Sequence, residues 1–291
     1  MELVVGHTTQ KDTLLRNSDT TVWLLCGKRG IGKCTLARAY AKHVTQSTEL
    51  ESNPDVMVIE NTHEPINVDK VREMKHFLHM TAINSDRKVA IVDSIDDLNI
   101  NSINAMLKTL EEPPEGSLTL LICHNLHSIP MVLRSRCATL LFHELSPEET
   151  KLVIDHNFSG TQHLSDKIAS LYPGTPGMVT EDIDKEISLY ENFVAIVHQK
   201  SLAPVKDILE VDLPLHKVEY ILLRVISDII YDILDRNPEN RTCCDGTIID
   251  MLERYHKAQE IFRTAHTMHL QENVTILRAL EIIAGRSATI E

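Results

Sequence analysis

A glycine-rich segment near the N-terminus has the residue types and spacing to bind a phosphate chain. Residues 27–34 read GKRGIGKC, which fits the pattern G-x-x-x-x-G-K-S/T except at its last position. The segment follows the apolar run 22–26 and opens a helical pattern, the context that this motif requires. Backbone N–H groups of such a loop surround phosphates, and the lysine reaches the outer ones. A chance glycine-rich turn is the alternative. The candidate nucleotide-binding residues here are Gly27, Gly30, Gly32, Lys33, Cys34 and Thr35.

The end of this motif argues against a metal ion. A Ser or Thr at position 34 would offer Mg²⁺ a hydroxyl, but Cys34 offers a soft sulfur, which is a poor ligand for a hard cation. Thr35 lies about 100° further round a helix and is no simple substitute. We therefore predict that ATP is the possible cofactor, that Mg²⁺ binds poorly, and that the chain has no metal site.

A second candidate for nucleotide chemistry is Asp93. It closes the apolar run 89–92, as does the carboxylate that holds Mg²⁺ through water in many ATPases. Many of these enzymes place Glu directly after this Asp to activate the attacking water, whereas here the residue is Ser94, which cannot act as a base near pH 7. Asp96 and Asp97 follow, and we interpret them as a solvated turn. The sequence thus predicts little or no ATP hydrolysis by this chain alone.

Composition excludes several classes of protein. The chain has 29 Lys and Arg against 42 Asp and Glu, a net charge of −13, so it lacks the basic face of an autonomous nucleic-acid binder. Its six cysteines show no C-x-x-C spacing, which argues against a disulfide framework and against zinc. The N-terminus does not resemble a signal peptide, and no apolar stretch is long enough for a membrane span, so we expect a cytoplasmic location. Cys243 and Cys244 receive no role.

The elements that must position these residues alternate between apolar runs and helical patterns. Four or five apolar residues without polar alternation are typical of strands buried on both faces. Three connecting segments, 33–44, 68–80 and 101–112, are long enough for crossover helices. We predict a doubly wound α/β domain with a parallel sheet. Its expected strands are 22–26, 56–59, 89–92, 118–122 and 138–142.

Helical signals dominate the rest of the chain. Asn101 or Ser102 is expected to cap the third crossover helix, and Ser146 the helix that follows the last strand. Beyond residue 187 apolar residues recur at three-and-four spacing, clearest over 218–234. We predict three modules: an α/β core over 1–142, a small helical lid over 143–186 and a helical domain over 187–291.

Several motifs in a fixed order resemble one known family, the AAA+ clamp-loader subunits of bacterial DNA polymerase III, and within it the delta-prime type. Residues 104–114 (NAMLKTLEEPP) look like the family's helix ending in L-E-E-P-P, and 135–137 look like its S-R-C motif. Residues 68–73 and 88–93 resemble the family's stretches that lead into its Walker B carboxylate, which in this chain is Asp93. The resemblance implies a P-loop sheet of AAA+ type, a helical lid and a C-terminal helical collar that holds subunits together.

The family assigns a role to Arg136. The arginine of S-R-C is an arginine finger that enters the ATP site of a neighbouring subunit, where its fixed charge meets the γ-phosphate. A structural ion pair is the alternative, and Arg134 is a weaker candidate for the finger.

Other family features are reduced or missing here. Asn125 or His124 occupies the region that senses the γ-phosphate, although a loop-structuring role is equally compatible. Active relatives have a second sensor Arg in the lid, where this chain reads GTPG at 174–177. The four-cysteine zinc module of many relatives is also missing between residues 43 and 55.

Two functions from different classes remain in competition. The first is a mainly structural clamp-loader subunit that gives Arg136 to a neighbour. Its partners would be gamma/tau-type and delta-type subunits in a hetero-oligomeric ring, with the sliding clamp and primed DNA engaged through the assembled complex and no membrane involved. The alternative is an active ATPase motor subunit of the gamma/tau type. A small-molecule kinase is disfavoured because no Arg-rich lid follows the α/β domain.

Overall fold

The computed structural model divides the chain into two compact units, Met1–Val179 and Thr180–Glu291, and each is treated separately below. The predicted three-module division with limits at 142 and 186 stays a prediction, and one helix, α8 (Ile183–Gln199), continues across residue 187. The structure describes residues 4–60, 66–157, 164–199, 203–236, 246–268 and 270–285. Cys243 and Cys244 lie outside these ranges.

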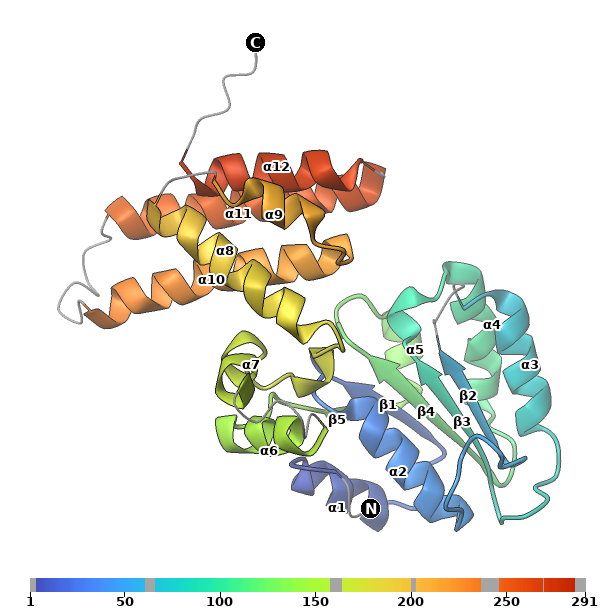
Figure 1. The fold of residues 1–291 in the computed structure, drawn as a ribbon. Coiled ribbons are helices and arrows are strands. Elements are labelled where there is room, and N and C mark those ends of the chain that lie inside the picture. Colours follow the sequence, from blue (N-terminus) through green and yellow to red (C-terminus); the bar gives the residue numbers. More distant parts are fainter. Residues whose placement is uncertain are drawn as a thin grey trace. The chain divides into compact units, whose positions relative to one another are not determined.

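A five-stranded sheet forms the centre of the N-terminal unit (Figure 1). The spatial order is β2-β3-β4-β1-β5, and every neighbouring pair is parallel. The predicted doubly wound α/β arrangement is therefore confirmed. Its strands are β1 (Val22–Cys26), β2 (Val56–Glu60), β3 (Lys88–Asp93), β4 (Ser117–Cys123) and β5 (Ala138–Leu141).

Helices cover both faces of this sheet. One apolar cluster joins α1 and α2 to one face, and a second joins α3 and α4 to the other. All three crossover helices predicted from the sequence are present within two residues of their expected ends. The helices are α1 (Thr8–Arg16), α2 (Lys33–Thr45), α3 (Val68–Leu78) and α4 (Ile100–Glu111).

Burial of the strands follows their place in the sheet. β1 and β4 are buried along their whole length, as is β3 up to Asp93. The expectation of burial on both faces is wrong for the edge strands β2 and β5, where side chains are partly or largely exposed, such as Leu141. An edge strand has a neighbour on one side only, so fewer side chains cover it.

Polar side chains cap the first turns of two helices and so determine where these helices begin. Asn99 caps α4 by accepting a hydrogen bond from the Ser102 backbone N–H at 2.9 Å, so the prediction of Asn101 or Ser102 as the cap is wrong. The helix begins earlier than expected, and Ser102 is buried instead. The predicted cap of α6 (Pro147–Asn157) is confirmed: the Ser146 hydroxyl and the Glu149 carboxylate each accept the other residue's backbone N–H.

In the described residues of the C-terminal unit, every regular element is a helix. A buried ion pair, Lys217 to Glu186 at 3.1 Å, lies inside this unit. The apolar stripe of α10 is buried over its first half, from Val218 to Ile226, and only partly buried from Ile229 onward. No helix within the described ranges is both long and apolar enough to cross a bilayer. Besides α8, its helices are α9 (Val205–Glu210), α10 (Leu215–Arg236), α11 (Gly246–Met268) and α12 (Glu272–Ile283).

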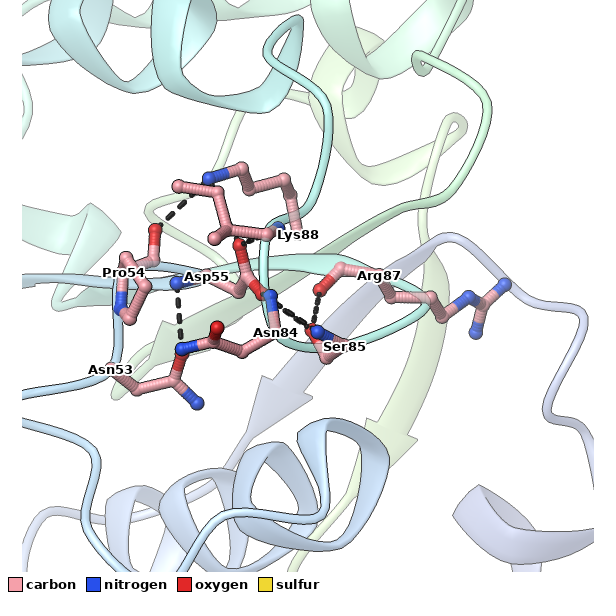
Figure 2. Close-up of polar contacts among 8 residues, drawn as sticks. Asn53, Pro54, Asp55, Asn84, Ser85, Arg87 and Lys88 are labelled. Carbon is pink, nitrogen blue, oxygen red and sulfur yellow. Dashed lines mark hydrogen bonds and ion pairs between the residues drawn. The ribbon is translucent and has the colours of Figure 1, made fainter.

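A buried ion pair stabilises the edge of the sheet where β2 and β3 begin (Figure 2). Lys88 Nζ lies 3.1 Å from Asp55 Oδ1. The Asp55 carboxylate also accepts backbone N–H groups of Ile83, Asn84 and Ser85 at 2.7–2.9 Å. Burial alone would raise the pKa of Asp55, but these hydrogen bonds and Lys88 lower it well below its usual value. The loop before β3 is thus tied to the start of β2.

Candidate functional site

The glycine-rich loop connects β1 to α2, as the motif requires. Gly27 donates its N–H to the Cys123 carbonyl at the end of β4, at 3.2 Å. Gly30 and Gly32 have φ of +80° and +98°, which lets the chain turn directly into α2 at Lys33. The loop therefore has the strand–loop–helix form of a phosphate-binding loop.

Lys33 is buried in this loop and is only 3% exposed. Its Nζ donates to the carbonyls of Gly27 at 2.5 Å and Lys28 at 2.6 Å, and it lies 3.1 Å from His124 Nδ1. Among the described residues no carboxylate lies within ion-pair distance of this ammonium. Burial lowers the pKa of Lys33 to about 8, and the charge of Asp93 partly opposes that effect. The loop thus holds a cation that is hydrogen-bonded but not neutralised.

Cys34 lies beside the carboxylate that would hold a metal. Burial, together with the charge of Asp93 and a hydrogen bond to it, raises the pKa of the Cys34 thiol to about 12, so the sulfur stays protonated. A neutral thiol is a poor Mg²⁺ ligand. Thr35 is exposed. Across the ranges that the structure describes, no group of three or more His, Cys, Asp or Glu residues is placed to hold a metal ion. The donor set does not fit Mg²⁺.

Of the two sensor candidates, only His124 faces the loop lysine. His124 Nε2 lies 3.9 Å from Asp93 Oδ1, and its other ring nitrogen meets Lys33. Burial and the Lys33 charge lower the pKa of His124, which favours the neutral ring that can accept from the ammonium. Asn125 is exposed, and its side chain accepts the backbone N–H of His127 at 3.0 Å. Asn125 therefore shapes the turn.

Asp96 also organises the loop after β4, so its interpretation as part of a solvated turn is wrong. Its carboxylate accepts the backbone N–H groups of His124 at 2.6 Å and Asn125 at 3.0 Å, and the Ser128 hydroxyl at 3.0 Å. These hydrogen bonds lower the pKa of Asp96 against the opposing effect of burial. The side chain of Asp97 lies outside the described part of the structure.

The segment that lacks the second sensor Arg contacts the phosphate loop through its backbone. The Gly177 N–H donates to the Gly30 carbonyl at 2.8 Å. A side chain on Gly177 would begin 2.9 Å from that oxygen, and one on Gly30 would begin 2.6 Å from Met178 Cγ. Both positions need glycine for this close approach. Main-chain groups therefore bridge the loop and η3 (Pro176–Met178).

His7 is a loop contact that sequence reasoning missed. Its Nε2 lies 2.7 Å from the Ile31 carbonyl, and its ring packs edge-on against Phe142 at 4.9 Å. Twenty-four residues separate His7 from Ile31. No local pattern marks such a contact, although a histidine just before the first helix, near a phosphate loop, was the available signal.

The S-R-C turn follows the short helix α5 (Met131–Arg134). Ser135 Oγ donates to the Val132 carbonyl at 3.1 Å, and Cys137 Sγ to the Leu133 carbonyl at 3.3 Å. Both flanking side chains thus bond back to α5, and the Arg136 side chain between them stays 28% exposed. Arg136 pairs with Glu111, so the ion pair considered as the alternative to a finger is present. Arg134 is partly buried.

Comparisons with known proteins agree with this geometry. A family model described as DNA polymerase III, delta subunit, matches residues 9–146. DNA polymerase III subunit gamma of Buchnera aphidicola is 34% identical in an alignment of 143 positions that covers 44% of this chain and 39% of the relative. Subunit delta′ of Pseudomonas aeruginosa is 33% identical in an alignment of 133 positions that covers 40% of each chain. The chain thus spans about two fifths of the length of these relatives.

A solved structure supports the fold over a longer range. A DNA polymerase III gamma subunit-related protein from Thermotoga maritima has a TM-score of 0.61 and covers 95% of this chain and 99% of its own, at 17% sequence identity. At that identity the likeness shows the fold alone, a parallel α/β sheet followed by helices. Over residues 9–146, the resemblance to clamp-loader subunits of DNA polymerase III is confirmed.

Proposed function

We propose that this chain is a clamp-loader subunit of DNA polymerase III, of the delta-prime type, that acts in DNA replication in the cytoplasm. It would give Arg136 to the ATP site of a neighbouring subunit and would hydrolyse ATP poorly itself. Its relatives bear both delta′ and gamma or tau names, so the choice of type depends on the chain's own residues.

The observation that carries the proposal is the placement of Arg136. Its turn is fixed from both sides by bonds to α5, and its side chain is 28% exposed. The same short helix carries two exposed apolar side chains, Met131 at 79% and Val132 at 51%. Exposed apolar side chains on the helix that precedes a fixed cation suit a protein interface. A guanidinium supplies permanent positive charge where a partner's γ-phosphate develops negative charge.

The chain's own nucleotide site supports a structural subunit. The phosphate loop and Lys33 fit the phosphates of ATP, so binding of ATP is part of the proposal. A protonated Cys34 thiol does not fit Mg²⁺, and Ser94 follows Asp93 where a general base would be needed. Backbone atoms of Gly177 lie against the loop from the region where active relatives place a sensor arginine.

The C-terminal unit would form the collar between subunits. Its longest apolar stripe, on α10, is only partly buried beyond Ile229, which leaves apolar surface for other chains. The net charge of −13 supports a role in which this chain is not the main grip on primed DNA, so that DNA and the sliding clamp would be engaged through the assembled complex.

The test is co-purification with gamma/tau-type and delta-type subunits, followed by ATPase assays with and without this chain. We expect a stable complex whose ATPase needs this chain, and almost no turnover by the chain alone. Arg136→Ala should leave assembly intact and lower hydrolysis at the neighbouring site by about 10³-fold. Robust turnover by the isolated chain, abolished by Lys33→Ala, would instead establish the alternative, a gamma/tau-type motor.

A further inference from the structure

Glu111 holds the guanidinium of Arg136 from the end of α4. Arg136 Nε donates to Glu111 Oε1 at 2.6 Å, and Nη2 donates to the same oxygen. On the other side, Nη1 donates to the Val132 carbonyl at 2.5 Å. The side chain of Arg136 is thus fixed at both ends of its planar group, by the L-E-E-P-P segment and by α5.

These bonds leave donors for a further partner. A guanidinium has five N–H groups, and Glu111 and Val132 take three of them. One N–H remains on Nη2 and one on Nη1, the latter 3.4 Å from the Ser135 hydroxyl in a long contact. The arrangement therefore orients the group without using all of its hydrogen-bonding capacity, which is what binding to a phosphate oxygen requires.

The negative charge of Glu111 destabilises the end of the helix that carries it. Glu111 is the last residue of α4, where a negative charge opposes the helix dipole. Its side chain is 45% exposed, so it does not fill the core. The side chain of the neighbouring Glu112 is also exposed and makes no hydrogen bond or ion pair with any described residue. Arg136 is the described side chain that Glu111 contacts.

We propose that Glu111 is a positioning residue, which fixes the Arg136 guanidinium so that it enters a neighbour's nucleotide site already oriented. This inference rests on the proposed function of Arg136. A free arginine side chain has many rotamers, and fixing one of them in advance removes that entropic cost from the step in which the finger meets the phosphate. Glu111 would touch neither nucleotide nor metal and would act only through Arg136.

The experiment compares variants in the reconstituted loader. Glu111→Ala is expected to lower kcat by about 10-fold at saturating ATP with KM little changed, since a hydrogen bond to a charged group is worth about one such factor. Glu111→Gln keeps an acceptor oxygen and should recover part of the loss. Glu112→Ala is the matched control and should stay within about twofold of the wild type.

A double-mutant cycle separates positioning from a general structural role. In the Arg136→Ala background, Glu111→Ala should not lower kcat further, because Glu111 acts only through the guanidinium that this background lacks. An equal further loss in that background, or full activity of Glu111→Ala alone, would overturn the inference.

A readout on the free subunit keeps the two proposals distinguishable. The Nε–H proton of Arg136, followed by NMR, should exchange slowly with water in the wild type and rapidly in Glu111→Ala. If Arg136→Ala supports full loader activity, the proposed finger is wrong, and the resonance alone decides whether Glu111 orients the guanidinium. An Nε–H resonance unchanged by Glu111→Ala would overturn the positioning role whatever the loader activity.

Discussion

Two lysines of the N-terminal unit are almost equally buried, but only one of them has a carboxylate partner. Lys33, in the phosphate loop, is 3% exposed, and Lys88, at the start of β3, is 4% exposed. Lys88 has a carboxylate partner in Asp55 and lies 4.7 Å from the centre of the Phe77 ring. Lys33 has carbonyls and a neutral histidine. A buried ammonium with its own counter-charge is a structural element, whereas one without a counter-charge marks a place where an anion can bind.

The largest effect on stability should come from removing the ion pair between Asp55 and Lys88. Asp55→Asn leaves Lys88 buried without a counter-charge and weakens the bonds to the loop before β3, so we expect the free energy of unfolding to fall by about 3–5 kcal/mol. Chemical denaturation measures this change. Asp86→Asn, at an exposed position of the same loop, is the control and should change stability by less than about 0.5 kcal/mol.

The same pair sets a dependence on acid. The folded-state pKa of Asp55 lies below its unfolded value, so its contribution is complete above about pH 4 and is lost as the pH falls toward the folded-state pKa. Asp55→Asn should therefore flatten the loss of stability below pH 4. A variant that loses stability in acid as steeply as the wild type would contradict this assignment.

Removing Lys33, the buried lysine that has no counter-charge, should weaken ATP binding and leave the stability of the fold almost unchanged. Lys33→Met deletes a charge that the fold does not neutralise, so the free energy of unfolding should change by no more than about 1 kcal/mol. Affinity for ATP should fall by about 10- to 100-fold, since a charged hydrogen bond is lost. Isothermal titration measures the second quantity. Lys28→Met, in the same loop but exposed, is the matched control and should bind nearly as tightly as the wild type.

The pKa of Lys33 predicts a pH profile with a definite sign. Below pH 8 Lys33 is protonated in both folded and unfolded chains, and the cost of burying it is complete. Between pH 8 and its usual value of 10.5 only the unfolded chain retains the proton, so this group's contribution to stability improves. Affinity for ATP should move the opposite way and weaken as the pH rises through 8. Affinity that stays constant from pH 7 to 9.5 would count against the assignment.

The smallest effect concerns the neighbouring cysteine. Cys34→Ser replaces a protonated thiol by a hydroxyl beside Asp93, so ATP should bind about fivefold more tightly with Mg²⁺ than with a chelator, a gain of about 1 kcal/mol. The wild type should show almost no such difference. Thr35→Ala should not change the result, because that residue is exposed.

The sequence predicted most of the sheet and its crossover helices because buried parallel strands and amphipathic helices leave strong local patterns. The error at the edge strands has a plain cause: β5 is as apolar in sequence as β1, and only the order of strands in the sheet decides which of them is covered. The cap of α4 was misplaced by two residues or more, since several neighbouring Asn and Ser residues could all serve.

The site was less accessible to sequence reasoning. The phosphate loop and the S-R-C turn are contiguous motifs, so their geometry followed from their spacing. His7, Asp96 and Glu111 act through contacts with residues 24 to 32 positions away, which no sequence periodicity reveals. The choice between His124 and Asn125 was also open, because the sequence does not tell which of two neighbouring residues after a strand points toward the phosphate loop; in the structure His124 contacts Lys33, and Asn125 accepts the backbone N–H of His127.

The hydrogen bond between Gly177 and Gly30 connects the phosphate loop directly to η3. It joins two uncharged amide groups, so neither salt nor pH weakens it directly. Any displacement of Gly30 must therefore either pull η3 along or break this bond. Gly177 lies two residues before Val179, where the N-terminal unit ends and the chain continues into the helical unit. The phosphate loop is thus tied by a main-chain bond to the segment that leads into the helical unit.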